Sequence, residues 1–597
     1  MLRPRPRRWI LPPLVAFTTL AAVTTSADAA PRFDPATFYA QATLRHMTLE
    51  EKVGQLFVAT VWGKSADEVN PANRVYGVDT PTQVVQRYHV GGVIYFNNPS
   101  TDNVDDPTQL AHFSNGLQRA ALSSGAHIPL TLSIDQEGGN VTRIVAPATE
   151  YPSSMAVGAT RSTQAATRLA TINARELRAM GINQNFAPDS DVNSNPINPI
   201  IGVRSFAGDP DLASRMVSAE VKGYQQGGWL PDTVSSAAKH FPGHGDAATD
   251  SHTGFPVISR TVEQWRQIDL PPFKAAIAAG VDSIMTAHIQ VPSLDPSGEP
   301  ATLSKPIMTG LLRDELKYDG VVVTDSLGMA GVRQMHPDKE IPVLALEAGV
   351  DQMLMPPDLN ITITGVLEAV HSGRLTEQRI DQSVTRILKM KFNRGILFNP
   401  LVNERAVAYR VGTPESLRQI QDISDRSVTV LRNDAGLLPV RTKPARILVT
   451  GWDNPAFPGL PAEPVATLAK AVGGTAIATG GAPSAAQIGQ AVAAANGSDL
   501  VIVLTNGLRT SASQTSLVNR LVATGKPVVA VAAQVPYDPA FADVPTWITT
   551  YAWRDMSMAS LAKVIFGQIS PRGKLPVNVP TADNTKVLFP FGTGLTW

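Results

Sequence analysis

Residues 239–256 read KHFPGHGDAATDSHTGFP, a stretch rich in side chains that can bind ligands or transfer protons. Three histidines and two aspartates lie within the fourteen positions from Lys239 to His252, although the whole chain has only ten histidines. Asp250 and His252 are two positions apart in a loop-like sequence, and a carboxylate beside an imidazole fixes its tautomer and raises its basicity. The pair therefore suggests acid–base chemistry.

A metal site is the alternative interpretation of the same stretch. Imidazole and carboxylate ligands of the kinds common in zinc sites are offered by His240, His244, His252 and either Asp246 or Asp250. However, the spacing matches no helical zinc motif, and the proline and glycines of FPGHG are incompatible with a helix. We favour the acid–base interpretation, and we expect no metal and no cofactor.

Acid–base groups need a reactive partner, and the best candidate is Asp325 in VVVTDSLGM, residues 321–329. This aspartate ends a strongly apolar run that is typical of a buried strand. A carboxylate at a strand end has a rigidly held backbone and can act as a nucleophile. The alternative is structural, because an aspartate in this position can also cap a following helix.

Short apolar runs alternate with amphipathic stretches from about residue 50 to 395, which indicates repeated strand–helix units. Helix-like segments include 162–181 and 304–317. Eight units predict a (β/α)8 TIM-type barrel, with a doubly wound open sheet as the alternative. The eight runs are VGQLFVAT, VGGVIYF, IPLTLSID, INQNFAPDSDV, VSSAAKHF, VDSIMTAHI, YDGVVVTD and VDQMLMP.

Most of these runs finish in a polar residue. The strand-end residues are Asp135, Asp189 or Asp191, Lys239 with His240, His288, and Asp325. In a barrel all of them lie on the face formed by the carboxyl ends of the strands, where active sites are built. We therefore expect these side chains to converge.

A second α/β pattern follows the barrel and predicts a smaller parallel sheet with helices on its faces. We predict an α/β chain with a barrel domain over 30–400, a linker over 401–440 and an α/β sandwich domain over 441–597. The second domain has no glycine-rich phosphate-binding motif, so a nucleotide role has no support.

The first 29 residues have the features of a secretory signal peptide: a basic start, an apolar run and the small residues of Ala27-Asp28-Ala29. A membrane anchor is the alternative, and Arg7-Arg8 leaves a twin-arginine route open. We expect a secreted protein, extracellular or in the cell envelope, without a stable membrane anchor after cleavage. Equal numbers of basic and acidic residues, 51 each, favour no nucleic-acid partner, and the lack of cysteine excludes disulfides and thiolate chemistry.

Several segments of the chain resemble a known family. Its 239–256 stretch is similar to the signature of glycoside hydrolase family 3 β-N-acetylglucosaminidases. So are four further segments of the predicted barrel: IDQEGG (134–139), IGVRSF (201–206), MTAHI (285–289) and VVVTDSLGM (321–329). SPRGKLPVNVP (570–580) and FGTGLTW (591–597) resemble the family's second domain. The resemblance spans residues 50 to 395 and the C-terminal part, with the motifs in the family's order.

The resemblance implies a role for each matching residue. Asp325 matches the catalytic nucleophile, His252 the acid/base and Asp250 its orienting partner. The positions that match sugar-binding residues of the −1 subsite are Asp135, Arg143, Arg204, Lys239 and His240. Asn140 departs from the family, which often has arginine there, so we expect an effect on packing or an outer subsite at most.

The implied activity is that of a retaining exo-β-N-acetylglucosaminidase, acting as a monomer on carbohydrate such as muropeptides or chitin oligosaccharides. Alternatives are a β-glucosidase or β-xylosidase of the same family, an N-acetylglucosaminide phosphorylase, a non-catalytic carbohydrate-binding protein and a metallohydrolase. The remaining conspicuous residues have structural interpretations. We expect His288 to line the pocket or fill the barrel top, Asp191 to order its loop, His336 to lie in a solvated loop, and Trp229 and Trp265 to be core.

Overall fold

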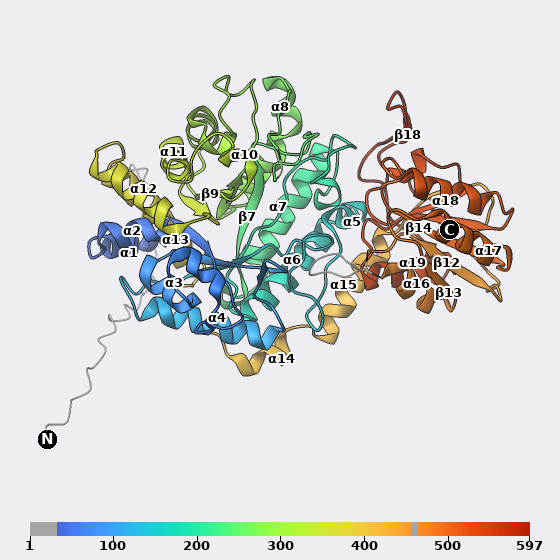
Figure 1. Cartoon of the computed structure of the whole chain (residues 1–597), viewed down its shortest axis with the longest axis horizontal. Coiled ribbons are helices and arrows are strands. Elements are labelled where there is room, and N and C mark those ends of the chain that lie inside the picture. The colour runs from blue at the N-terminus through green and yellow to red at the C-terminus, as the bar shows by residue number, and fades with distance from the viewer. Residues whose placement is uncertain (1–32, 253, 455–462) are drawn as a thin grey trace, which may run out of the picture.

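The computed structural model describes residues 33–252, 254–454 and 463–597. The predicted signal segment, 1–29, lies outside the described residues. The chain forms two bodies side by side, a larger one built from its first part and a smaller one, orange to red, from its last part (Figure 1).

The larger body is a closed barrel of eight strands in the order β1-β10-β9-β8-β7-β6-β5-β2, and every neighbouring pair is parallel. This confirms the predicted TIM-type barrel over the open sheet. The strands are β1 (Phe57–Thr60), β2 (Gly92–Tyr95), β5 (Thr131–Ile134), β6 (Gln184–Asn185), β7 (Ser235–Phe241), β8 (Ser283–Thr286), β9 (Val321–Ser326) and β10 (Gln352–Leu354). A small hairpin, β3 (Asn97–Asn98) and β4 (Thr101–Asp102), follows β2.

Helices surround the barrel (Figure 1). Those of the first half are α1 (Pro35–Leu44), α2 (Leu49–Gln55), α3 (Pro81–Tyr88), α4 (Pro107–Leu122), α5 (Ser154–Ala159), α6 (Thr163–Ala179) and α7 (Pro210–Gln226). Those of the second half are α8 (Val262–Ile268), α9 (Leu270–Ala278), the π-helical segment η5 (Pro306–Glu315), α10 (Ala330–Arg333), α11 (Ile341–Ala348), α12 (Leu359–His371) and α13 (Glu377–Asn393). The predicted helix over 162–181 is α6, where the Ser162 side chain accepts a hydrogen bond from Ala165 N and so caps the first turn.

Strands buried on both faces account for the unbroken apolar runs of the sequence. Outward-facing residues pack beneath the helices in the main core, and inward-facing residues fill the barrel. The interior cluster consists of Val58, Ile94, Phe186, Ala237, Met285, Val323 and Leu354. Since the barrel is packed with side chains, a substrate can only reach its ends, and the site must lie on the loops.

The smaller body is a six-stranded sheet in the order β11-β16-β15-β14-β12-β13, parallel except for β11. Its strands are β11 (Thr429–Asn433), β12 (Ile447–Gly451), β13 (Thr475–Ala478), β14 (Leu500–Thr505), β15 (Val528–Ala532) and β16 (Thr546–Thr549). Its helices are α16 (Pro464–Val472), α17 (Ala485–Asn496), α18 (Ala512–Val522) and α19 (Asp555–Ile565). Before them in the chain, α14 (Val407–Arg410) packs against α4 and α6 of the barrel, and α15 (Pro414–Ser427) contacts both α5 and α19. A hairpin of β17 (Val579–Pro580) and β18 (Val587–Phe589) follows.

The segment 401–440, predicted as a linker, contains regular structure. It carries α14, α15 and β11, and β11 forms an edge of the second sheet. A single antiparallel edge strand extends a parallel sheet without a crossover helix, so its short run carries no α/β alternation that the sequence pattern could reveal.

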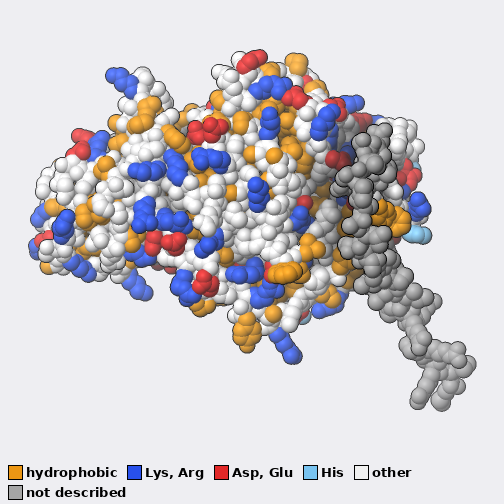
Figure 2. All heavy atoms as spheres, turned by 180° about the vertical axis from the view of Figure 1, so that it is seen from behind, with side chains coloured by type: hydrophobic (Ala, Val, Ile, Leu, Met, Phe, Trp, Pro, Cys, Tyr) orange, Lys and Arg blue, Asp and Glu red, His pale blue; other side chains and the backbone are white. Residues whose placement is uncertain are grey.

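The surface agrees with a balanced composition. On the face in Figure 2, basic side chains are spread widely with acidic ones among them, as expected from equal numbers of the two charges. None of the helices in the described part of the chain has the length and apolar character needed to cross a membrane.

Candidate active site

Asp325 lies at the end of β9, on the face where the carboxyl ends of the barrel strands meet. Its Oδ1 accepts a hydrogen bond of 2.7 Å from the backbone amide of Ser326. Burial raises the pKa of this carboxyl, but the nearby His240 imidazole and the Ser326 amide outweigh burial, and the pKa lies below its usual value near 3.8. The group is therefore an ionised carboxylate at neutral pH, as a nucleophile must be.

Lys239 lies near the carboxyl end of β7, whose residues are all buried, and its side chain is only 3% exposed. The ammonium lies 2.8 Å from Asp135 Oδ1 and 2.6 Å from Glu137 Oε1. Burial lowers the pKa of Lys239, but these two carboxylates outweigh burial and raise it, so the lysine stays charged. The end of β7 is thus tied to the loop that follows β5.

Arg204 joins the same group from the short helical turn η2 (Gly202–Arg204). Its guanidinium donates two hydrogen bonds of 2.9 Å to the two oxygens of Glu137. The same guanidinium lies 3.3 Å from His240 Nε2. Planar guanidinium and carboxylate groups that meet through two bonds are held in one geometry, so Arg204 has little freedom to turn.

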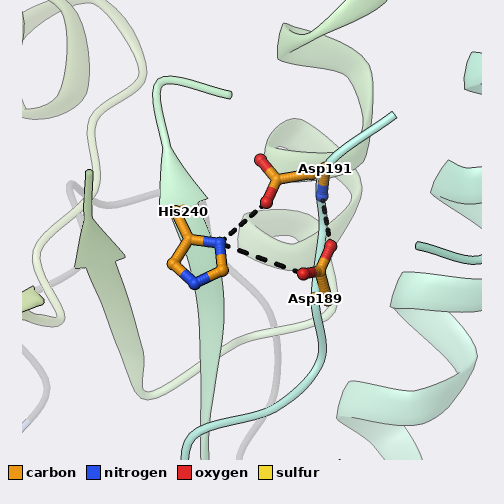
Figure 3. A group of neighbouring side chains, drawn as sticks. All are labelled: Asp189, Asp191 and His240. Carbon is orange, nitrogen blue, oxygen red and sulfur yellow. Dashed lines mark hydrogen bonds and ion pairs between the residues drawn. The ribbon is translucent and has the colours of Figure 1, made fainter. Parts of the chain in front are cut away.

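His240 is oriented by the loop after β6. Its Nδ1 lies 2.7 Å from Asp191 Oδ2 (Figure 3). Asp191 Oδ1 accepts a 2.6 Å bond from the backbone amide of His244. Burial and the neighbouring Asp191 raise the pKa of Asp189 well above its usual range. We name this set of side chains the charged cluster: Asp135, Glu137, Asp189, Asp191, Arg204, Lys239 and His240.

Arg143 lies at the rim of the charged cluster. Its guanidinium is 3.8 Å from Asp135 Oδ2 and 5.0 Å from the centre of the Phe96 ring. The structure therefore brings together all five predicted sugar-binding residues: Asp135, Arg143, Arg204, Lys239 and His240.

Asp250 and His252 meet on the loop beyond β7. His252 Nδ1 lies 2.8 Å from Asp250 Oδ1, and the same oxygen accepts a bond from the His252 backbone amide. Because Nδ1 faces the carboxylate, Nε2 is the nitrogen free to exchange a proton with a substrate. The His252 side chain is 59% exposed, and its imidazole is among the groups that lower the pKa of Asp325.

The chain matches the family descriptions of two domains. The glycosyl hydrolase family 3 N-terminal domain matches residues 48–390, and the family's C-terminal domain matches residues 428–597. This chain belongs to glycosyl hydrolase family 3. By family it is a glycoside hydrolase.

Named relatives of this family 3 chain are similar over most of its length. It is 38% identical over 384 residues to the beta-hexosaminidase A of Pseudoalteromonas piscicida, covering 60% of this chain but only 62% of that protein. It is 30% identical to a beta-N-acetylglucosaminidase/beta-glucosidase of Cellulomonas fimi, covering 70% and 71%. A solved family 3 beta-N-acetylglucosaminidase of Paenibacillus sp. str. FPU-7 superposes with a TM-score of 0.79 at 35% identity, covering 90% of this chain and 99% of that one.

Glu137 is the functional-site residue that the sequence analysis missed. It lies two positions after Asp135 in IDQEGG, and its carboxylate is the common partner of Lys239 and Arg204. The motif itself was the available signal, but nothing in its spacing shows which acid faces the barrel axis. Asp191, a strand-end residue that was expected to order its loop, also orients His240.

The alternative metal set is not assembled. Among the described residues, only Asp189, Asp191 and His240 place three possible ligand atoms within 4.8 Å of one another (Figure 3). The Arg204 guanidinium already pairs with one of these three residues, because it lies 3.7 Å from Asp189 Oδ2. Since His240 Nδ1 also faces Asp191, we assign no metal to this family 3 site.

The loop that carries the Asp250–His252 dyad is held in place by Ser251, which lies between the two residues. His244 Nε2 lies 3.0 Å from Ser251 Oγ, and both residues are buried. The Ser251 carbonyl accepts a 3.3 Å bond from Gly331 N, just beyond β9. A Cβ on Gly245 would lie 1.9 Å from the carbonyl oxygen of Val192, so close packing in this loop requires glycine at position 245.

Other residues singled out in the sequence have different surroundings. His288 is buried, with Nδ1 2.8 Å from Thr302 Oγ1 and Nε2 3.0 Å from the Ser326 carbonyl. It therefore supports the strand end beside Asp325. Trp265 is core as expected, at 1% exposed, whereas the same expectation is wrong for Trp229, which is 85% exposed.

Two smaller expectations concern His336 and Asn140. His336, expected in a solvated loop, lies 2.8 Å from Glu299. Asn140 Nδ2 donates a 2.9 Å bond to Gln534 Oε1 of the second domain. The departure from the family pattern at Asn140 is therefore part of the contact between the two domains.

Ser251→Ala should lower kcat about fivefold and leave KM unchanged. The substitution removes the bond to His244 that holds the dyad loop, a bond worth about 1 kcal/mol, while the charged cluster stays intact. Steady-state kinetics on a substrate that requires a proton donor measures the effect. Ser100→Ala, in an exposed loop, is the control, and an unchanged kcat in Ser251→Ala would show that the fastening is not needed.

Glu137→Gln should lower the free energy of unfolding at pH 7 by about 3 kcal/mol, because two buried cations lose their shared counter-charge. Burial raises the pKa of Glu137, but Arg204 and Lys239 outweigh burial and lower it far below its usual value. The charge therefore stabilises the fold above the unfolded pKa near 4.5, and this contribution is lost as the pH falls toward the folded pKa.

Urea unfolding of both proteins at pH 7 and at pH 3 checks this. The difference in the free energy of unfolding between the wild type and Glu137→Gln should reach its full value at pH 7 and should be smaller at pH 3. Glu377→Gln, which breaks a pair of 2.7 Å between Lys52 and a 57% exposed carboxylate, should change stability by less than about 1 kcal/mol. A pH-independent difference for Glu137→Gln would contradict the assignment.

Proposed function

We propose that this protein is an exported, retaining exo-β-N-acetylglucosaminidase. Its substrate would be a non-reducing terminal N-acetylglucosamine on muropeptides or chitin oligosaccharides. The enzyme would act as a monomer and would use no metal or cofactor. The observation that carries the proposal is the pairing of Asp250 with His252 on a loop beside an ionised Asp325. The names of the Pseudoalteromonas, Cellulomonas and Paenibacillus relatives support the choice of a 2-acetamido sugar.

The chemistry would take two steps. First, an Asp325 oxygen forms a bond to the anomeric carbon while the bond from that carbon to the leaving oxygen breaks. His252 Nε2 gives its proton to the departing oxygen. Second, water attacks the anomeric carbon of the glycosyl ester, His252 takes a proton from the water, and the Asp325 carboxylate leaves.

The charged cluster would hold the sugar during both steps. The Lys239 ammonium and the Arg204 guanidinium are buried donors already fixed by Glu137. Donors that are fixed before binding lose little freedom when they meet sugar hydroxyls or the acetamido oxygen, so the anomeric carbon can be presented to Asp325 in one orientation.

The deciding experiment compares 4-nitrophenyl N-acetyl-β-glucosaminide with the matching β-glucoside. We expect kcat/KM at least tenfold higher for the N-acetylglucosaminide, and a preference for the glucoside would overturn the proposal in favour of a β-glucosidase. Product analysis on chitobiose and on purified peptidoglycan fragments then identifies the substrate. Detection of N-acetylglucosamine 1-phosphate when inorganic phosphate is added would favour the phosphorylase alternative, since an imidazole base repels phosphate less than a carboxylate does.

A further inference from the structure

The turn that carries Arg204 is shared between the two domains. Arg204 points its guanidinium into the charged cluster, but its neighbour Val203 is 1% exposed and belongs to an apolar core of the second domain. The second-domain members of that core include Leu431, Val501, Tyr537, Trp547, Leu575 and Val577. Helix α5 contributes Met155, Ala156 and Ala159, and Figure 1 shows it at the junction.

A loop of the second domain, 533–541, packs against this turn. It follows the carboxyl end of β15. A Cβ on Gly202 would lie 3.1 Å from Val535 Cγ1, and Gly202 has a φ of +43°, so glycine permits both the backbone conformation and the close approach. The loop therefore sets where η2 can lie.

The same loop is also linked to the charged cluster through the hydroxyl of Tyr537. Tyr537 is 8% exposed, and its Oη accepts a 2.9 Å bond from Asn193 Nδ2. Asn193 N donates to Ser205 Oγ at 3.2 Å, and Ser205 Oγ donates to the Asp191 carbonyl at 2.6 Å. Asn193, Ser205 and their neighbours Asp191 and Arg204 thus form one fastened unit.

We propose that Tyr537 is a positioning residue, and that through Asn193 and Ser205 it lets the second domain fix Arg204 for sugar binding. The inference rests on the proposed role of Arg204 in holding the sugar. It gives the second domain a part in the site although every predicted catalytic residue comes from the barrel.

The alternative is that the tyrosine only fastens the domains together. Other contacts already do so without the 202–205 segment: Ser153 Oγ donates a 2.7 Å bond to the Tyr551 carbonyl, and Arg554 pairs with Glu150. Removing one hydroxyl from Tyr537 therefore leaves the domains joined, and its effect on sugar binding can be measured separately.

The test is Tyr537→Phe in the full chain. Loss of one buried hydrogen bond should raise KM for the aryl N-acetylglucosaminide, and the inhibition constant of N-acetylglucosamine, about fivefold, while kcat changes less than twofold. Tyr551→Phe is the matched control. It removes a buried tyrosine hydroxyl whose 2.8 Å partner is Thr429 Oγ1, within the second domain, so its KM should stay at the wild-type value.

A double-mutant cycle with Arg204→Lys shows whether the effect runs through Arg204. We expect the Tyr537→Phe increase in KM to shrink below twofold in the Arg204→Lys background. An unchanged KM in Tyr537→Phe, or an equal increase in both backgrounds, would overturn the inference. If Arg204→Lys alone leaves KM unchanged, the proposed sugar-binding role is the part that is wrong. Asn193→Ala breaks the same bond from the barrel side and takes the place of Tyr537→Phe if that variant does not fold.

Discussion

Asp325→Ala should lower kcat/KM on an aryl N-acetylglucosaminide by about 10⁴- to 10⁶-fold, the scale on which loss of a catalytic nucleophile or its activating partner acts in other hydrolases. The reason is geometric and electrostatic. Asp325 ends a buried strand, is fixed by the Ser326 amide at 2.7 Å, and carries a carboxylate whose pKa lies below its usual value. Alanine removes the atom that would bond to the anomeric carbon.

Steady-state kinetics and a trapping experiment check this together. A 5-fluoro glycosyl fluoride of N-acetylglucosamine slows hydrolysis of the glycosyl ester, so mass spectrometry of the digested protein should place the sugar on the peptide that contains Asp325. Asp319→Ala is the control and should retain activity, because it removes only an exposed carboxylate that pairs with Arg386. Near wild-type turnover in Asp325→Ala, or labelling at another residue, would refute the assignment.

The pKa of Asp325 also has consequences for pH. Because the folded pKa is below the usual 3.8, the carboxylate stays ionised at neutral and mildly acidic pH. Its contribution to stability is present above the unfolded pKa and is lost as the pH falls toward the folded value. A loss of activity between pH 5 and 7 would therefore be due to a group other than Asp325.

His252→Ala should lower kcat/KM by about 10²- to 10⁴-fold on chitobiose, whose leaving oxygen needs a proton. On 2,4-dinitrophenyl N-acetyl-β-glucosaminide the first step needs no acid, so the variant should form the glycosyl ester at a near wild-type rate and accumulate it. Added azide should then speed turnover and give the β-glycosyl azide, because an anion can attack without a base.

Asp250→Asn is the matched variant for the dyad. It keeps the 2.8 Å contact with His252 but removes the charge that stabilises the protonated imidazole, so its loss should be smaller than that of His252→Ala. The pH profile of kcat/KM should lose one ionisation in His252→Ala. Equal losses of activity on both substrates, with no azide product, would contradict the acid/base assignment.

Periodic features of the sequence predicted the barrel correctly, since buried parallel strands read as apolar runs and strand ends read as polar residues. The same reasoning placed Asp325, Lys239 and His240 on one face. It did not predict that Glu137 would join Lys239 to Arg204, because ion pairs between loops of different strands depend on where side chains point, and spacing along the chain does not encode that. The contacts of Gln534 with Asn140 and of Tyr537 with Asn193 could not be predicted for a related reason: they form only when the two domains have packed together.

The exposure of His252 affects what the enzyme can accept. The −1 sugar would be held by buried and mutually fixed charges, whereas His252, the proposed proton donor, has 59% of its side chain open to water. The group on the far side of the glycosidic bond would then project into solvent and meet few walls. The enzyme would recognise one terminal sugar and make few contacts with the rest of the substrate. A peptide-bearing fragment and a plain oligosaccharide would therefore present the same bond to Asp325.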